Sequence, residues 1–236
     1  MTSIQATIAK PQYCRREAWD YFVKQLPKLN TTEGLLRAAI GVSLHALDDL
    51  DPAIPERRLR MLSECVVERS PSRHVSALQA NLHGVLFDED GFLGNLENYY
   101  NALNSYLPAV LNTRRGLPVS LALIYKVVGE WSGLSVEGIN APGHFLTRVW
   151  DGATWMIVDP FFRGQLLTEE QAFQRIEKVV GRTWPRDEVF LAPATHSQWI
   201  ARLLGNLRQL FANENRHDDL AAMTELALAL DTYYPA

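Results

Sequence analysis

A histidine and an aspartate in neighbouring strand-like segments are the residues of this chain best suited to acid-base chemistry. His144 and Asp159 stand in the runs HFLTRVW and TWMIVDP, which flank Asp151-Gly152. Asp-Gly between two such runs predicts a β-hairpin with a two-residue type I′ turn. In that register Trp150 pairs with Ala153 and, further along the same strands, His144 pairs with Asp159. Because opposed residues share a face of the sheet, the sequence predicts an imidazole beside a carboxylate, as general acid-base catalysis requires.

The role of this pair is open at the level of the sequence. A four-residue loop in place of the two-residue turn would shift the register and break the pairing of His144 with Asp159. A hydrogen-bonded cross-strand pair can also serve only to stabilise the hairpin. The pair therefore admits a catalytic and a structural interpretation.

The segment before the hairpin offers a place for a nucleophile. Residues 114–118, RRGLP, form a turn that opens a helix, because proline suits the first helical turn. An apolar helix is expected over residues 119–131. The N–H groups and the dipole at a helix start stabilise an anion, so a nucleophile there could act with the His–Asp pair. Ser120 is the candidate by residue type, although a serine inside an apolar helix is usually a packing residue.

Six short motifs, taken together, resemble a known family. They are similar to the transglutaminase-like core of the papain-type cysteine-enzyme fold and, more narrowly, to bacterial transglutaminase-like proteins of the SirB type, in which a tetratricopeptide-like tail follows the core. The resemblance runs from about Leu35 to the C-terminus. The motifs are NLHGVLF (81–87), GFLGN (91–95), NSYLP (104–108), RRGLP (114–118), GINAPGHFL (138–146) and VDPF (158–161).

The resemblance implies an α+β fold. We expect a papain/transglutaminase-like core in which helices pack on a small antiparallel sheet, with an all-helical N-terminal part and a C-terminal helical hairpin. The expected division is an N-terminal arm (1–30), a transglutaminase-like domain (31–185), and a connector with a single tetratricopeptide-like helical pair (186–236).

The same comparison reveals a departure from catalytic transglutaminases, which carry a thiol at the start of this helix. Aligning their Gly-x-Cys motif on Gly116 places Pro118 at the thiol position, and a shift of two residues places Ser120 there. Neither residue is a cysteine, and the sequence does not decide which of them occupies the nucleophile position. SirB-type proteins commonly carry Ser or Thr nearby, so the resemblance implies a transglutaminase-like protein without the catalytic thiol.

The composition excludes several classes of protein. A net charge of −4, with only short and mixed basic runs, argues against a nucleic-acid-binding protein. Two cysteines cannot form a disulfide framework, which favours a reduced, cytoplasmic location. No signal-peptide pattern and no run of about 18 apolar residues is present, so we expect no membrane association. We expect no metal and no cofactor, because residues 88–90 lack the spacing of a calcium loop and no glycine-rich phosphate loop occurs.

The tail has the pattern of two amphipathic helices. Residues 199–211 carry one broad apolar face, and Leu220, Met223, Ala227 and Leu230 form a narrower strip on the next helix. Residues 199–232 span 34 positions, the tetratricopeptide period, and a lone repeat cannot bury its own apolar face. We therefore expect the first helix to dock on the core. The second should leave its apolar strip to a partner, which could be a second copy in a homodimer formed through the C-terminal helices.

Three functional hypotheses follow. The first, which we favour, is a non-catalytic module that binds a peptide or protein, with Asn104, Arg115 and Asn140 as candidate binding residues in the shared motifs. The second is a hydrolase or acyltransferase that uses Ser120 as nucleophile, His144 as base and Asp159 as orienting acid, so that the three residues form a working triad or the remnant of one. The third is a structural or regulatory partner whose cleft is filled by side chains such as Trp155 and Phe162.

Overall fold

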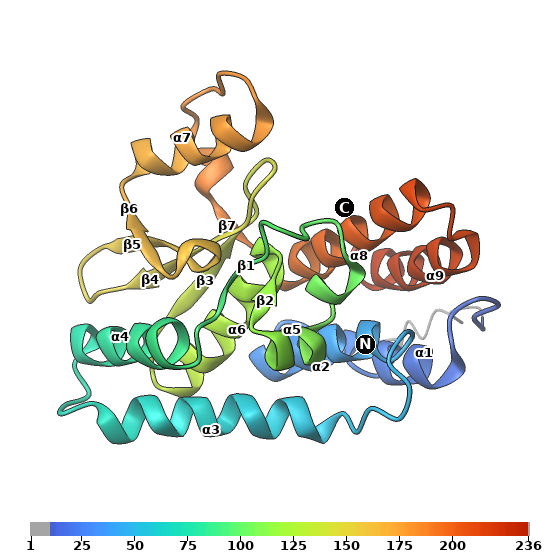
Figure 1. The fold of residues 1–236 in the computed structure, drawn as a ribbon, viewed down its shortest axis with the longest axis horizontal. Coiled ribbons are helices and arrows are strands. Elements are labelled where there is room, and N and C mark those ends of the chain that lie inside the picture. The colour runs from blue at the N-terminus through green and yellow to red at the C-terminus, as the bar shows by residue number, and fades with distance from the viewer. Residues whose placement is uncertain (1–9, 236) are drawn as a thin grey trace, which may run out of the picture.

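A buried helix, α6 (Pro118–Trp131), forms the centre of the fold in the computed structural model, which describes residues 10–235. Nearly every side chain of α6 is buried, as expected for a helix that is apolar on all sides. Pro118 occupies the first turn, where its missing N–H costs no helical hydrogen bond. Figure 1 shows α6 between the sheet and the helices of the lower layer.

The main sheet is small and antiparallel, in the order β6-β5-β4-β3-β7. A separate pair of very short strands, β1 and β2, runs parallel just before α6. The strands are β1 (Leu93–Gly94), β2 (Arg115–Gly116), β3 (Val136–Ile139), β4 (Leu146–Trp150), β5 (Trp155–Asp159), β6 (Gln165–Leu167) and β7 (Pro193–Ala194).

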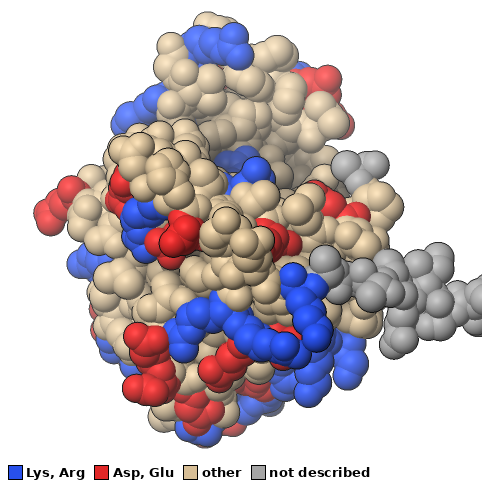
Figure 2. Space-filling model, turned by 90° about the vertical axis from the view of Figure 1, so that its right-hand side faces the viewer, with Lys and Arg blue, Asp and Glu red and all other residues tan. Residues whose placement is uncertain are grey.

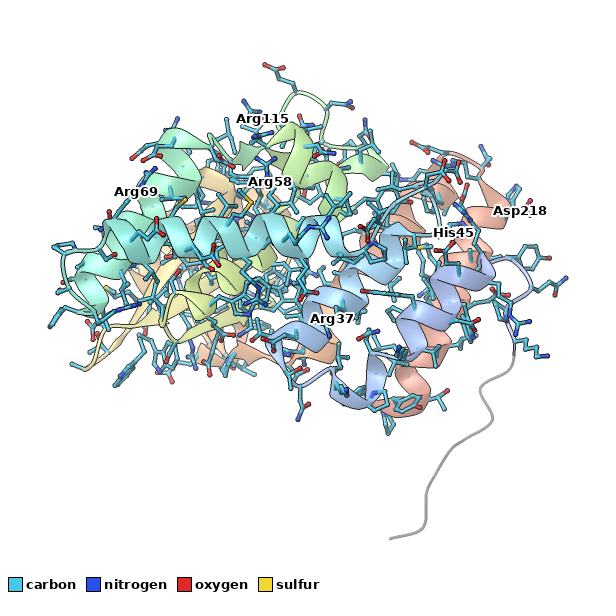
Figure 3. All side chains as sticks on the ribbon, turned by 90° about the horizontal axis from the view of Figure 1, so that it is seen from below. Arg37, His45, Arg58, Arg69, Arg115 and Asp218 are labelled. Carbon is cyan, nitrogen blue, oxygen red and sulfur yellow. The ribbon has the colours of Figure 1, made fainter. Side chains whose placement is uncertain are left out.

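Helices make up the rest of the molecule. In the view from below, α3 runs across the face of the protein, and the labelled Arg58 and Arg69 mark its course (Figure 3). The helices other than α6 are α1 (Arg16–Val23), α2 (Thr32–Ser43), α3 (Ala53–Arg69), α4 (Val75–His83), α5 (Leu107–Thr113), α7 (Glu169–Val180), α8 (His196–Asn213) and α9 (His217–Tyr233), with a π-helical turn (Gly84–Glu89) and short 3₁₀ turns at Leu26–Lys28, Ala102–Asn104, Pro160–Phe162 and Glu188–Leu191.

The two faces of the sheet pack against different helices. On β5, Val158 belongs to the main hydrophobic core around α6, whereas its neighbour Ile157 belongs to a smaller cluster under α7. On β4, Val149 and Leu146 divide in the same way. Successive side chains of a strand point to opposite faces, so α6 covers one face of the sheet and α7 covers the other (Figure 1). The observed α+β architecture confirms the expected fold class, including the C-terminal helical hairpin.

The hairpin between β4 and β5 differs from the predicted one in its loop. Trp150 pairs with Trp155, not with Ala153, so four residues, 151–154, form the loop. The Asp151 carboxylate accepts from the N–H groups of Ala153 and Thr154, at 2.7 Å each, and Gly152 adopts φ +108°. The predicted two-residue turn was wrong because the aspartate side chain organises a wider loop.

The N-terminal segment, assigned above to an arm, contains the helix α1, which packs on the core; residues 1–9 lie outside the described residues. Ala18 and Phe22 of α1 have no exposed surface and belong to the main core. The N–H groups of residues 12–14 all donate to the carboxylate of Glu225 on α9. Nearby, His45 Nε2 lies 3.1 Å from Asp219 Oδ1 and links the end of α2 to α9. Figure 3 labels His45 and, at the start of α9, Asp218.

The first tail helix, α8, docks on the core as predicted. Its apolar side chains, such as Leu203 and Leu207, are buried in the main hydrophobic cluster. The expected strip on α9 is not left open, because Met223 and Leu230 are buried and α1 lies beside α9 (Figure 1). That part of the prediction was wrong, since these side chains belong to the main core, where α9 packs on α8 and on α1. A homodimer through these helices stays a prediction.

Candidate functional site

His144 and Asp159 lie in contact although the hairpin register is not the predicted one. His144 Nε2 is 3.0 Å from Asp159 Oδ2 and 3.1 Å from Oδ1. The observed register differs from the predicted one by two residues, and a two-residue shift keeps both side chains on the same face of the sheet. His144 precedes β4 in a turn closed by its own N–H and the carbonyl of Ala141, at 3.2 Å. Its imidazole therefore reaches Asp159 diagonally.

The backbone before the histidine is set by Gly143. This residue adopts φ +69°, a left-handed conformation that glycine adopts without steric cost. A Cβ atom there would also lie 2.8 Å from the Val179 side chain on α7. The packing against α7 therefore explains why a glycine precedes His144 in the Pro-Gly-His segment. A larger residue at position 143 would collide with Val179.

Three donors converge on the fully buried Asp159 carboxylate. Besides His144 Nε2, the N–H of Phe161 donates to Oδ1 at 3.1 Å, and Arg175 Nε lies 3.4 Å from Oδ2. Asp159 also caps the short helix that follows it. The carboxylate therefore fixes the orientation of the imidazole, whose second nitrogen, Nδ1, has no hydrogen bond to any of residues 10–235.

An open cleft of about 650 Å³ lies beside this pair. We call it the His144 cleft. The start of α6, the segment 96–105, α7 and α8 form its walls. Figure 2 shows it as a hollow beneath the lobe at the top of the view, with Lys and Arg atoms on its floor. Its lining consists of Leu96, Tyr99, Tyr100, Asn101, Ser105, Leu117, Pro118, Gly143, His144, Phe161, Phe162, Arg175, Lys178, Val179, Arg202, Asn206, Gln209, Leu210 and Asn213.

Pro118 and not Ser120 lines the cleft at the start of α6. Ser120 is 1% exposed, and its Oγ makes no hydrogen bond with any of residues 10–235. The structure therefore brings His144 and Asp159 together, and Ser120 has no hydrogen bond to either of them.

The helix start also offers few donors for an oxyanion. The N–H of Leu117 donates to the Asn104 carbonyl at 3.0 Å, the N–H of Ser120 donates to the Leu117 carbonyl at 3.1 Å, and Pro118 has no N–H. Two of the donors that a tetrahedral intermediate would need are thus already engaged, and a third does not exist.

The three predicted binding residues do not line the cleft. The Asn104 amide is buried and engaged, since it donates to the carbonyls of Asn98 and Tyr99 and accepts from Asn95. Arg115 lies in β2, near the upper edge of the view in Figure 3, and donates to the Gly91 carbonyl. These two residues shape the loops beside the cleft.

Asn140 follows β3, and its side-chain oxygen is buried without a hydrogen-bond partner among residues 10–235. Of the cleft-filling residues considered from sequence, Phe162 lines the His144 cleft and leaves it open, whereas Trp155 lines a different hollow.

Three cations in the cleft escaped the sequence analysis. Arg175 and Lys178 come from α7, and Arg202 comes from α8. Arg175 and Lys178 are three residues apart on one helix, so the sequence could have predicted that they share a face of that helix. No local pattern predicts that Arg202 lines the cleft, because its position depends on how α8 docks on the core.

The three cations differ in their partners. The Arg175 guanidinium is held by Asp159, by Gln165 at 2.7 Å and by the ring of Phe162, whose centroid is 3.9 Å away. Arg202 is half-buried and donates to the Ala141 carbonyl at 2.7 Å, and burial lowers the pKa of Arg202. Neither Arg202 nor Lys178 forms an ion pair with another of the described residues.

A second hollow, of about 740 Å³, lies at the edge of β3 and α6. We call it the Lys126 hollow. Lys126 is 4% exposed and donates to Glu130 Oε1 at 2.6 Å and to the Val136 carbonyl at 2.7 Å. Glu130 accepts in addition from the hydroxyl of Thr32. Lys126 is therefore paired with Glu130, and Glu137, which also lines the hollow, is paired with Arg148 at 2.6 Å.

The remaining candidate chemistry is sparse in the part of the chain that the structure describes. No three His, Cys, Asp or Glu side chains of residues 10–235 are arranged to hold a metal ion. None of the helices in this range has the length and apolar character to cross a membrane. The two cysteines, Cys14 and Cys65, are free thiols, and neither lines the cleft.

Comparison with known proteins identifies relatives over most of the chain. Residues 46–205 match the transglutaminase-like superfamily. A UPF0162 protein of Xylella fastidiosa is 32% identical over 83% of this chain and 71% of its own length, and one of Vibrio cholerae is 27% identical over 72% and 63%. Human F-box only protein 21 is 40% identical over 96 residues, which are 37% of this chain and 15% of that protein. No solved structure matches the chain.

Proposed function

Because the chain belongs to the transglutaminase-like superfamily, we propose that its His144 cleft binds a peptide or protein segment without forming a covalent bond to it. The observation that carries this proposal is the residue at the start of α6. Pro118 lines the cleft together with His144, and proline has neither a nucleophilic side chain nor an N–H. No cysteine is among the described residues that line the cleft, which supports a site that holds its ligand without attacking it.

The surroundings of the cleft support the proposal. Leu96 and Tyr100 line it and expose large apolar surfaces, Tyr100 to 77% of its maximum. Apolar surface beside a cleft is typical of sites for other proteins. We also propose that the protein is of the SirB type with a tetratricopeptide-like tail and that it acts in the cytoplasm. The helical pair α8–α9 and the two free thiols support these assignments.

A second function stays open because the His144–Asp159 pair is intact. If Ser120 moved toward His144 on ligand binding, the protein could act as a hydrolase or acyltransferase with these three residues. In that event a fluorophosphonate probe should label Ser120 in the wild type and fail to label the Ser120→Ala variant. We expect no labelling of the wild type.

The binding function is tested by selecting a displayed peptide library on the immobilised protein. Val179→Trp places a bulky side chain in the cleft, whereas Val189→Trp makes the same change at an exposed position that does not line it. Selected peptides should bind the wild type and Val189→Trp and lose at least tenfold in affinity for Val179→Trp. Peptides that bind Val179→Trp as well as the wild type, or a library from which no peptide is retained, would contradict the proposal.

A further inference from the structure

We propose that the His144 cleft recognises a carboxylate on the bound peptide, with Arg202 as the main anchor and Lys178 as the second cation. This inference rests on the proposed function and names the chemistry of its ligand.

The charge in the cleft has one sign. Arg175, Lys178 and Arg202 line it, and no Asp or Glu is among its lining residues. The whole chain carries a net charge of −4, so this local excess of cations is not a consequence of the overall composition. A concave site lined by one sign of charge attracts ligands of the opposite sign.

Arg202 is the cation whose environment most favours an anionic ligand. It is half-buried, and its guanidinium donates to the Ala141 carbonyl while forming no ion pair with a residue in the described range. A guanidinium has five N–H donors and can hold a carboxylate with two parallel hydrogen bonds. A cation that has lost part of its hydration without gaining a counter-charge is stabilised when a carboxylate arrives.

The other two cations take different parts. Arg175 is already neighboured by the Asp159 carboxylate, at 3.4 Å, and by the Phe162 ring, so it holds the site together. Lys178 lies one turn along α7 and forms no ion pair with another described residue. Lys178 and Arg202 therefore reach the cleft from two different elements of its wall, α7 and α8.

The apolar wall indicates a peptide rather than a small inorganic anion. Leu96, Tyr99, Tyr100 and Phe162 line the cleft together with the cations. A site for inorganic phosphate alone would gain nothing from these side chains, whereas a peptide with an apolar residue beside its carboxylate would use both walls.

The test compares five synthetic peptides by isothermal titration calorimetry. Three are acetyl-Ala-Leu-X-Leu-Ala-amide with X as Asp, Asn or phosphoserine. The other two are acetyl-Ala-Leu-Ala-Leu with a free C-terminal carboxylate or as the amide. The five peptides separate a side-chain carboxylate, a terminal carboxylate and a phosphate.

The proteins are the wild type, Arg202→Gln, Arg202→Lys and the control Arg208→Gln, which removes an exposed arginine from the same helix outside the cleft. For the wild type and Arg208→Gln, we expect at least one carboxylate peptide to bind at least tenfold tighter than its neutral match. Arg202→Gln should lose this preference, and Arg202→Lys should retain part of it, since lysine keeps the charge without the two-pronged geometry.

Each failure has a distinct pattern. Equal binding of acidic and neutral peptides, or a preference that survives Arg202→Gln, overturns the carboxylate assignment and leaves the peptide cleft standing. Tighter binding of the phosphoserine peptide than of every carboxylate peptide makes the site a phosphate site, which also overturns the assignment. If none of the peptides binds a folded wild type, both this inference and the proposed function fail.

Discussion

The Lys126 hollow and the His144 cleft have similar volumes, about 740 and 650 Å³, and opposite arrangements of charge. In the first, a buried lysine is paired with a glutamate and a carbonyl. In the second, Arg202 and Lys178 have no acidic partner in residues 10–235. A charge that is paired inside the protein supports the fold, whereas a half-buried charge without a partner costs stability and is available to a ligand.

The difference shows why the larger hollow is the poorer candidate for a binding site. An incoming ion would have to displace Glu130 or the Val136 carbonyl from Lys126 before gaining a contact. In the His144 cleft, Arg202 has N–H donors beyond the one that it gives to the Ala141 carbonyl, so a carboxylate can bind without displacing that contact. The predictions below concern this distinction, and they run from the largest expected effect to the smallest.

Asp159→Asn should cause the largest loss of stability, because Asp159 is a paired and fully buried charge behind the lining of the His144 cleft. The variant keeps the shape of the side chain but removes the charge that faces Arg175 and His144 in a fully buried position. We expect a loss of about 3 kcal/mol in the free energy of unfolding, measured in urea.

The control for this variant is Asp88→Asn, whose carboxylate also faces an arginine, Arg163 at 3.1 Å, but is exposed. It should change the stability by less than about 0.5 kcal/mol. If the two substitutions lowered the stability equally, burial of the Asp159 pair would not contribute to the stability. The distinction between buried paired charges and exposed ones would then be wrong.

Lys126→Met should destabilise the protein by about 2 kcal/mol, because it removes the ammonium that donates to the Val136 carbonyl and to Glu130, which keeps only the hydroxyl of Thr32. We expect a smaller loss than the roughly 3–5 kcal/mol typical of breaking a fully buried ion pair, because the Glu130 side chain is 25% exposed. The matched substitution in the cleft is Lys178→Met, which breaks no ion pair and should shift the stability by less than about 0.5 kcal/mol. A larger loss for Lys178→Met than for Lys126→Met would reverse the assignment of the two hollows.

Arg202→Gln should leave the free energy of unfolding within about 0.5 kcal/mol of the wild type in the absence of ligand. The lost hydrogen bond to the Ala141 carbonyl is offset by removal of a desolvated charge. Urea unfolding of both proteins measures the difference. A loss as large as that of Lys126→Met would make Arg202 a structural residue.

The last prediction concerns the reactivity of the thiols, for which we expect the smallest effect because no cysteine lines either hollow. Burial raises the pKa of Cys14 to about 12, with a further contribution from the charge of Glu225. At pH 8 only about one molecule in ten thousand then carries the thiolate. Cys14 should resist iodoacetamide in the native protein and react in urea, as followed by peptide mass spectrometry. Rapid labelling of Cys14 in the native state would contradict the burial and reopen the question of a reactive thiol.

Local patterns in the sequence were sufficient for much of the fold. The apolar helix after Pro118, the helix ending at Gly181 and the docking of residues 199–211 follow from periodicity and helix-end signals, and the structure has them. The contact of His144 with Asp159 was also predicted, because a two-residue error in register leaves side chains on the same face.

Features that depend on the contacts of one side chain, or on how distant helices pack together, could not be predicted from the sequence. The wide loop at residues 151–154 arises from hydrogen bonds of the Asp151 carboxylate, which Asp-Gly statistics do not contain. Burial of the α9 strip depends on how α9 packs on α8 and on α1, which is far away in the chain, and the position of Arg202 depends on the docking of α8. Asn104 looked available in the sequence, but the folded loop uses its amide.

The central claim, that the His144 cleft and not the Lys126 hollow binds an acidic peptide without covalent chemistry, is most directly tested by NMR. The tightest carboxylate peptide would be titrated into ¹⁵N-labelled protein, and the intact mass of the protein would be measured afterwards. We expect amide shifts at Tyr100, Lys178 and Arg202, none at Lys126 or Glu137, and an unchanged mass. Shifts confined to the residues of the Lys126 hollow, or a protein whose mass has increased by an acyl group, would contradict the account.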